Sequence, residues 1–108
     1  MTDGASLVEA LPDVAAEVEG LLRLEGESTL ASQVRGLRIL DRCRCGDEFC
    51  ATIYTVARPA GPWGPGHYTL PLRPKRGHII VDILNGRIVE LEILYRDEIR
   101  ERLVSLLP

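Results

Sequence analysis

The sequence lacks the features that mark several specialised classes of protein. No apolar run approaches the roughly 18 residues that cross a membrane, and no basic and then apolar N-terminus resembles a secretory signal. The three cysteines are an odd number and too few for a disulfide scaffold. Thirteen Lys and Arg against sixteen Asp and Glu exclude a strongly basic nucleic-acid-binding tail. These absences favour a cytoplasmic, soluble protein without a membrane partner, whose 108 residues (1–108) form a single domain.

Charge is distributed unevenly along the chain. Residues 1–34 carry seven acidic residues and one basic residue, whereas residues 35–87 carry nine basic and four acidic residues. A basic middle suits an acidic partner or a phosphate backbone, but no ladder of aromatic residues accompanies the arginines. We therefore expect the acidic N-terminal part to offset the basic strands, and nucleic-acid binding stays an unsupported alternative.

Helical periodicity is confined to the two ends of the chain. Apolar residues recur at helical spacing over residues 11–22, where Pro12 suits the first helical turn. Ser28 is predicted to cap a short second helix that Gly36 closes. A last helix is predicted over residues 97–107. Helices thus begin and end the domain.

Between the helices the period of the apolar residues changes to two. Residues 37–45 and 50–56 predict one hairpin, whose first strand places Leu37, Ile39, Cys43 and Cys45 on one face. Residues 67–72 and 78–84 predict two further strands. The Pro- and Gly-rich residues 57–66 are predicted to form a loop. Short connections imply antiparallel pairing. The sequence therefore predicts an α+β domain, an antiparallel meander sheet of about five strands with the N-terminal and C-terminal helices packed on one face.

The hairpin around Asn85-Gly86 has two possible registers. A two-residue loop would place Asp82 among apolar residues of the next strand, whereas a three-residue loop over residues 84–86 pairs odd positions with odd positions. We predict the three-residue loop, with Tyr95 at the end of the shared apolar face. Nine residues are expected to be buried: Ile79, Val81, Ile83, Val89, Leu91, Ile93, Val18, Leu22 and Leu103.

The opposite face of this hairpin carries Asp82, Glu90 and Glu92. Three carboxylates on one strand face suit a cation, but one face of an antiparallel sheet is commonly solvated. We interpret these residues as a solvated face.

The cysteines form the one unusual cluster of the sequence. Cys43, Cys45 and Cys50 lie within eight residues, with one residue between the first two and four residues between the last two. Three thiolates suit Zn²⁺, although zinc sites more often use pairs spaced by two to four residues. The fourth ligand is expected from His67, with His78 and Asp47 as further candidates.

The length of the cysteine loop decides whether this site exists. A four-residue loop places Cys45 opposite Cys50 with Cys43 on the same face, whereas a three-residue loop separates the three. Two alternatives stay open beside zinc. In the first alternative, the thiols are packed as small hydrophobic groups. In the second, Cys45 and Cys50 form a redox disulfide, and Arg42 and Arg44 favour the thiolate.

Trp63 lies in the Pro- and Gly-rich loop, where it either packs against the edge of the core or contacts a partner. Arg42 and Arg44 are further candidates for partner binding. The leading hypothesis is a non-enzymatic binding or interaction module, whose partner is another protein or a second copy joined through an edge strand. The alternatives are a zinc-binding protein with a structural site at the cysteine hairpin and a small redox or His67-dependent enzyme.

Three motifs together resemble a family of small uncharacterised bacterial proteins. They are Cys-x-Cys-Gly-x₃-Cys-Ala-Thr-x-Tyr (43–54), Trp-Gly-Pro-Gly-His (63–67) and Asn-Gly-Arg-Ile-Val-x-Leu-Glu-Ile-Leu (85–94). The resemblance covers the last two-thirds of the chain. It implies a bacterial cytoplasmic protein and no assigned activity.

Overall fold

A computed structural model describes residues 4–108 of the chain. Its elements, in chain order, are β1 (Ala5–Ser6), α1 (Leu7–Ala10), α2 (Pro12–Leu24), α3 (Ser28–Gln33), the 3₁₀ helix η1 (Val34–Gly36), β2 (Arg38–Ile39), β3 (Asp41–Arg42), β4 (Ile53–Tyr54), β5 (His67–Pro71), β6 (His78–Leu84), β7 (Arg87–Leu94) and α4 (Asp97–Leu106). Among these described elements, no helix has the length and apolarity needed to cross a membrane.

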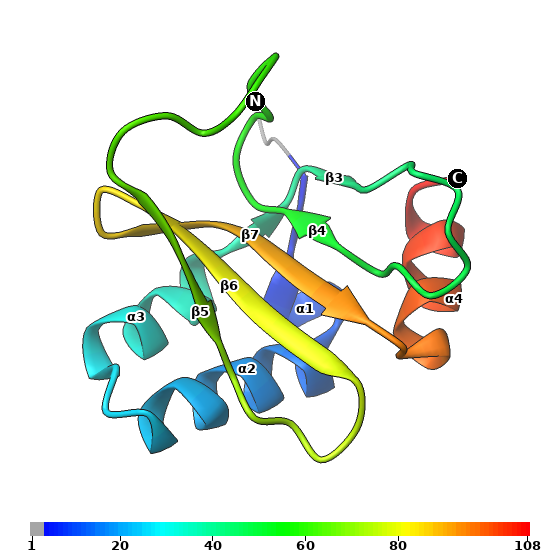
Figure 1. The fold of residues 1–108 in the computed structure, drawn as a ribbon. Helices are drawn as coiled ribbons and strands as arrows, with labels where there is room; N and C mark the ends of the chain where they lie inside the picture. Colours follow the sequence, from blue (N-terminus) through cyan, green and yellow to red (C-terminus); the bar gives the residue numbers. More distant parts are fainter. Residues whose placement is uncertain (1–3) are drawn as a thin grey trace.

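The main sheet has five antiparallel strands in the order β3-β4-β7-β6-β5, and β1 pairs with β2 in a separate two-stranded sheet. Strands β5, β6 and β7 follow one another as a meander, and β4 adds to the free side of β7 (Figure 1). The prediction of an α+β fold with an antiparallel sheet is therefore confirmed. β5 forms one edge of this sheet, and self-association through an edge strand stays a prediction.

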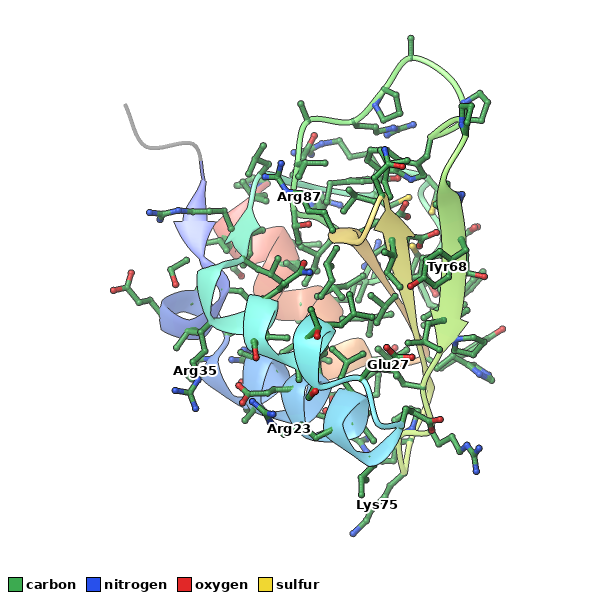
Figure 2. The ribbon with its side chains drawn as sticks, turned by 90° about the vertical axis from the view of Figure 1, so that its left-hand side faces the viewer. Arg23, Glu27, Arg35, Tyr68, Lys75 and Arg87 are labelled. Atoms are coloured by element: carbon green, nitrogen blue, oxygen red, sulfur yellow. The ribbon has the colours of Figure 1, made fainter. Side chains whose placement is uncertain are left out.

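The helices cover one face of the main sheet, which we call the inner face, and leave the other, outer face to the loops. Figure 2 shows the helices on one side of the sheet, whose edge strand β5 carries Tyr68. All nine residues predicted to be buried are buried. The core joins residues of α1, α2, α3 and α4 to the inner faces of β6 and β7. Apolar burial of this kind is the main favourable contribution to the stability of such a domain.

The turn between β6 and β7 differs from the predicted three-residue loop. Leu84 pairs with Arg87, so the loop contains only Asn85 and Gly86, both with positive φ (51° and 83°). The register then shifts by one residue, because Ile83 pairs with Ile88 and Asp82 pairs with Glu90. Val89 is the extra residue of this β-bulge. The predicted odd-to-odd pairing is therefore present beyond the bulge, but a bulge and not the loop produces it.

The predicted strand over residues 37–45 is divided at Leu40. β2 pairs with β1, whereas β3 pairs with β4, so the chain changes sheet between them. Leu37 and Ile39 enter the core, and Cys43 and Cys45 do not. The prediction that these four residues share one face of a single strand is therefore wrong, because the alternation of side chains restarts where the chain changes partner.

Two smaller predictions are also corrected. Tyr95 does not extend the apolar face: it has a positive φ of 61° and is exposed, because the chain turns there toward α4. Ser28 is the first residue of α3 rather than its cap, and Glu27 at the cap position makes no side-chain capping bond.

Candidate functional site on the outer face of the sheet

The three cysteine sulfurs come together beside the outer face. The sulfur atoms of Cys43, Cys45 and Cys50 all lie within 4.8 Å of one another, and all three thiols are free. Asp41 pairs with Tyr54, and the amide of Cys43 donates to the carbonyl oxygen of Thr52 at 3.0 Å. This register brings Cys45 opposite Cys50, as the four-residue loop requires. Sulfurs around a tetrahedral Zn²⁺ lie ~3.8 Å apart for Zn–S bonds of ~2.3 Å, so small side-chain movements would suffice to hold an ion.

The thiols differ in how easily they ionise. Burial raises the pKa of Cys43 to about 11. Burial also opposes ionisation of Cys50, but hydrogen bonds with Thr52 and with the two other thiols outweigh it and lower the pKa of Cys50. The Oγ1 of Thr52 lies 3.4 Å from the sulfur of Cys50. A thiophilic cation would therefore meet a thiolate first at Cys50 and would displace a proton from Cys43.

A second cluster of ionisable groups lies on the outer face of β6 and β7. One carboxylate oxygen from each of Asp82, Glu90 and Glu92 lies within 4.8 Å of the other two. Asp82 is only 2% exposed, and Glu90 and Glu92 are half-buried. The interpretation of these three residues as a solvated face is therefore wrong for Asp82, because the connection before β5 and the start of β5 cover it.

Two side chains from that segment fix the orientation of the carboxylates. The Nε2 of His67 lies 2.7 Å from Oδ1 of Asp82, and the indole Nε1 of Trp63 donates to Oε1 of Glu90 at 3.0 Å. Oδ2 of Asp82 is buried and has no hydrogen-bond partner among residues 4–108. An unpaired buried oxygen is costly, because it loses its hydration without gaining a partner.

Two carboxyl groups of this cluster, those of Glu90 and Glu92, have raised pKa values. Hydrogen bonding with Asp82, burial and the nearby negative groups raise the pKa of Glu92 to about 8. Burial also raises the pKa of Glu90, although the bond from Trp63 acts in the opposite direction. Without a cation, Glu92 therefore keeps its proton to a higher pH than an exposed glutamate does.

Tyr54 lies between the two clusters. It pairs with Glu90 across β4 and β7, so its side chain is on the outer face. Burial and the charges of Glu90 and Cys43 raise the pKa of Tyr54 to about 12, and the guanidinium of Arg58 lies 5.2 Å from the centre of its ring. The cysteine cluster and the acidic cluster are thus neighbours on one surface, with a neutral phenol between them.

The remaining residues proposed from the sequence make contacts within the chain. His67 bonds Asp82, and neither His67 nor the candidate ligand Asp47 belongs to the cluster formed by the three cysteines. His78 packs edge-on against Tyr95. Arg42 donates to the carbonyl oxygen of Leu107 at 2.6 Å. Arg44 donates to the carbonyl oxygen of Pro108 at 2.8 Å and pairs with Asp41 at 3.1 Å. The roles of Trp63, Arg42 and Arg44 in partner binding stay predictions.

The acidic residues were interpreted from the sequence as a solvated face, so this part of the site was missed. Its carboxylates come from β6 and β7, whereas Trp63 and His67, which bond them, come from the distant segment before β5 and from its first residue. One signal was present: an aspartate in the middle of β6 stands beside the predicted strand that begins with His67. An adjacent edge strand brings such a histidine within reach of the aspartate.

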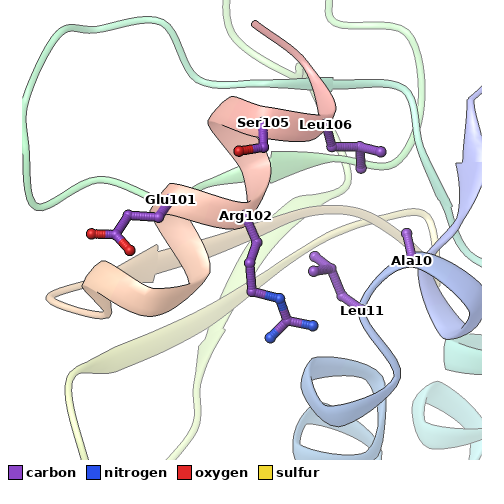
Figure 3. Close-up of a pocket in the computed structure, with 6 residues that line it drawn as sticks. All are labelled: Ala10, Leu11, Glu101, Arg102, Ser105 and Leu106. Carbon is purple, nitrogen blue, oxygen red and sulfur yellow. The ribbon is translucent and has the colours of Figure 1, made fainter.

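A hollow on the opposite side of the molecule is not a comparable site. Figure 3 shows it between α4 and the junction of α1 and α2, with Leu11, Arg102 and Leu106 among its lining residues. Arg102 already makes two hydrogen bonds of 2.8 Å to Asp13. The guanidinium in its lining is therefore already paired within the chain.

Comparisons of the chain with models of protein families, with curated proteins and with solved structures found no match.

Proposed function

We propose that this protein is a non-enzymatic metal-binding protein that holds a thiophilic divalent cation, Zn²⁺, at Cys43, Cys45 and Cys50. The observation that carries the proposal is the mutual approach of the three free sulfurs within 4.8 Å. Thiolates are the ligands that select zinc over harder cations. Free thiols also fit a cytoplasmic location, where cysteines stay reduced.

The ion would have a structural role at the tip of the β3–β4 hairpin. The hairpin has no regular strand between Arg42, where β3 ends, and Ile53, where β4 begins. Within this segment Cys50 makes an isolated bridge to Leu94. An ion bound by three thiolates would close this irregular segment. A water molecule would complete the coordination, because His67 is held by Asp82.

Cobalt(II) substitution tests this proposal directly. Reduced, metal-free protein titrated with Co²⁺ is expected to show thiolate-to-cobalt charge-transfer absorption that saturates at one equivalent and disappears when Zn²⁺ is added. Replacing the exposed Cys45 with serine removes one ligand without disturbing the core, so the absorption should be lost. The matched control is Asp47→Asn, in the same loop, which should bind as the parent does.

The result also separates zinc binding from the other roles of the thiols. Added Zn²⁺ should raise the melting temperature of the parent and of Asp47→Asn but not of Cys45→Ser. If the parent shows no charge-transfer absorption and Cys45→Ser melts as the parent does, the thiols are packing groups and the proposal fails. Stable oxidation of Cys45 and Cys50 to a disulfide in the presence of Zn²⁺ would also contradict it.

A further inference from the structure

We propose that Asp82, Glu90 and Glu92 form a second metal site, separate from the cysteines, for a hard divalent cation such as Mg²⁺ or Mn²⁺. The site lies on the outer face where β6 and β7 are paired, because Asp82 is directly opposite Glu90. It uses no cysteine and does not depend on the zinc proposal.

The unpaired oxygen of Asp82 is the observation that points to a ligand. Oδ1 of Asp82 is already engaged by His67 at 2.7 Å, whereas Oδ2 is buried without a partner. An acidic group on a solvated surface would turn such an oxygen to water. Here burial prevents that, and the oxygen belongs to a cluster with the carboxylates of Glu90 and Glu92. A cation among the three would supply the missing contact.

The acidic cluster carries negative charge that a cation would neutralise. Three carboxylates meet there, and His67 is the ionisable group that bonds one of them directly. Arg58 acts on Glu90 from a greater distance, while its guanidinium stacks on Tyr54. Neighbouring buried carboxylates cannot all ionise without a counter-charge, and a divalent cation provides one.

The arrangement of donors identifies the class of ion. His67 and Trp63 each hold one oxygen of a carboxylate, as groups behind metal ligands commonly do. The oxygens left for an ion are carboxylate oxygens, which Mg²⁺, Mn²⁺ and Ca²⁺ prefer and which thiophilic ions do not require. His67 is thus a positioning residue rather than a ligand in this site.

Mn²⁺ is the probe for the test, because its paramagnetism reports binding in two ways. Free Mn²⁺ is counted from its electron paramagnetic resonance signal during titration of the whole chain with its thiols kept reduced. Bound Mn²⁺ should also quench the fluorescence of Trp63, the single tryptophan of the sequence, which contacts Glu90. We expect one equivalent of Mn²⁺ to bind and Mg²⁺ to compete with it.

Variants locate the binding. Asp82→Asn should weaken Mn²⁺ binding by more than about tenfold and abolish the quenching, whereas Asp47→Asn, which removes an exposed charge, should leave both unchanged. Glu92→Gln should repeat the result of Asp82→Asn, so that a folding defect in one variant cannot decide the test. His67→Ala should weaken binding about tenfold, and His67→Gln, which keeps a donor for Asp82, should restore it in part.

Three results would overturn the proposal. One is the absence of saturable Mn²⁺ binding in the parent. Another is parent-like binding in both Asp82→Asn and Glu92→Gln. The last is loss of Mn²⁺ binding in Cys45→Ser, which would show that the two clusters act as one site. Failure of the zinc proposal alone would remove the cobalt absorption and leave the binding of Mn²⁺ intact.

Discussion

Glu92 shows how one carboxyl group links the outer face to the stability of the whole chain. Its proton is retained by Asp82, by burial and by the proximity of Glu90 and Cys50, which raise its pKa from 4.5 to about 8. The folded chain therefore binds this proton more tightly than the unfolded chain does. Between the two pKa values the unfolded state has fewer protons bound, so the free energy of unfolding falls as the pH rises.

We predict that metal-free protein, kept in a chelator, has its Glu92-dependent stability fully present below pH 4.5 and loses it as the pH approaches about 8. The measurement is urea unfolding of the parent and of Glu92→Gln across this range. Glutamine cannot ionise, so the variant should gain stability relative to the parent as the pH rises. If the difference in unfolding free energy between the two proteins does not change with pH, the assignment of the raised pKa to Glu92 is contradicted.

At the scale of an element, the start of β6 depends on a glycine that approaches another strand closely. Gly77 has a φ of 67°, and a Cβ there would collide with the backbone oxygen of Leu94 and the side chain of Arg96. Gly64 also has a positive φ, of 94°, but a Cβ there would meet no atom within 4 Å. The two positions therefore share backbone strain and differ in the collision.

Gly64→Ala is expected to cost about 1 kcal/mol of unfolding free energy from backbone strain alone. Gly77→Ala should cost clearly more, because the carbonyl of Leu94 belongs to β7 and cannot move away independently. Chemical denaturation of both variants measures the difference. Equal losses would show that the collision at Gly77 relaxes without cost.

The elements also show which parts of the fold the sequence determines locally. The alternation of apolar residues in β6 and β7 and the helical spacing in α2 were sufficient to predict those elements and the buried residues. The cysteine cluster was also predictable, because a four-residue loop brings Cys45 and Cys50 together. The break at Leu40 and the contact of His67 with Asp82 were not, because each depends on which distant strand becomes the neighbour.

At the scale of the whole molecule, two arginine–carboxylate pairs join α2 to the region of α4. Arg96, at the start of α4, makes hydrogen bonds of 2.9 and 3.0 Å to Glu17, and its side chain is 10% exposed. Arg102 makes two bonds of 2.8 Å to Asp13, but its side chain is 39% exposed. The two pairs have similar geometry and different access to water.

Burial should decide what each pair contributes. Glu17→Gln leaves a buried guanidinium with one fewer counter-charge, although Glu98 remains at 2.8 Å, and should cost roughly 1–3 kcal/mol of unfolding free energy. Asp13→Asn breaks the solvated pair and should cost less than about 1 kcal/mol. Thermal and urea unfolding of the two variants provide the comparison. A larger loss for Asp13→Asn would mean that the exposed pair is the stronger link between the helices.

The bulge at Val89 gives the protein an unusual dependence on chain length. Val89 is one additional residue between Ile88 and Glu90, and it has no partner on β6. With Val89 deleted, Ile88 and Glu90 would be neighbours and would keep their partners Ile83 and Asp82, so the pairing would continue without a bulge. Deletion of Leu91 would instead place Glu92 opposite Val81 on the inner face and Ile93 opposite Ile80 on the outer face. The strand can therefore lose a residue at the bulge without exchanging its faces, whereas a one-residue deletion at a paired position would disrupt both the acidic cluster and the core.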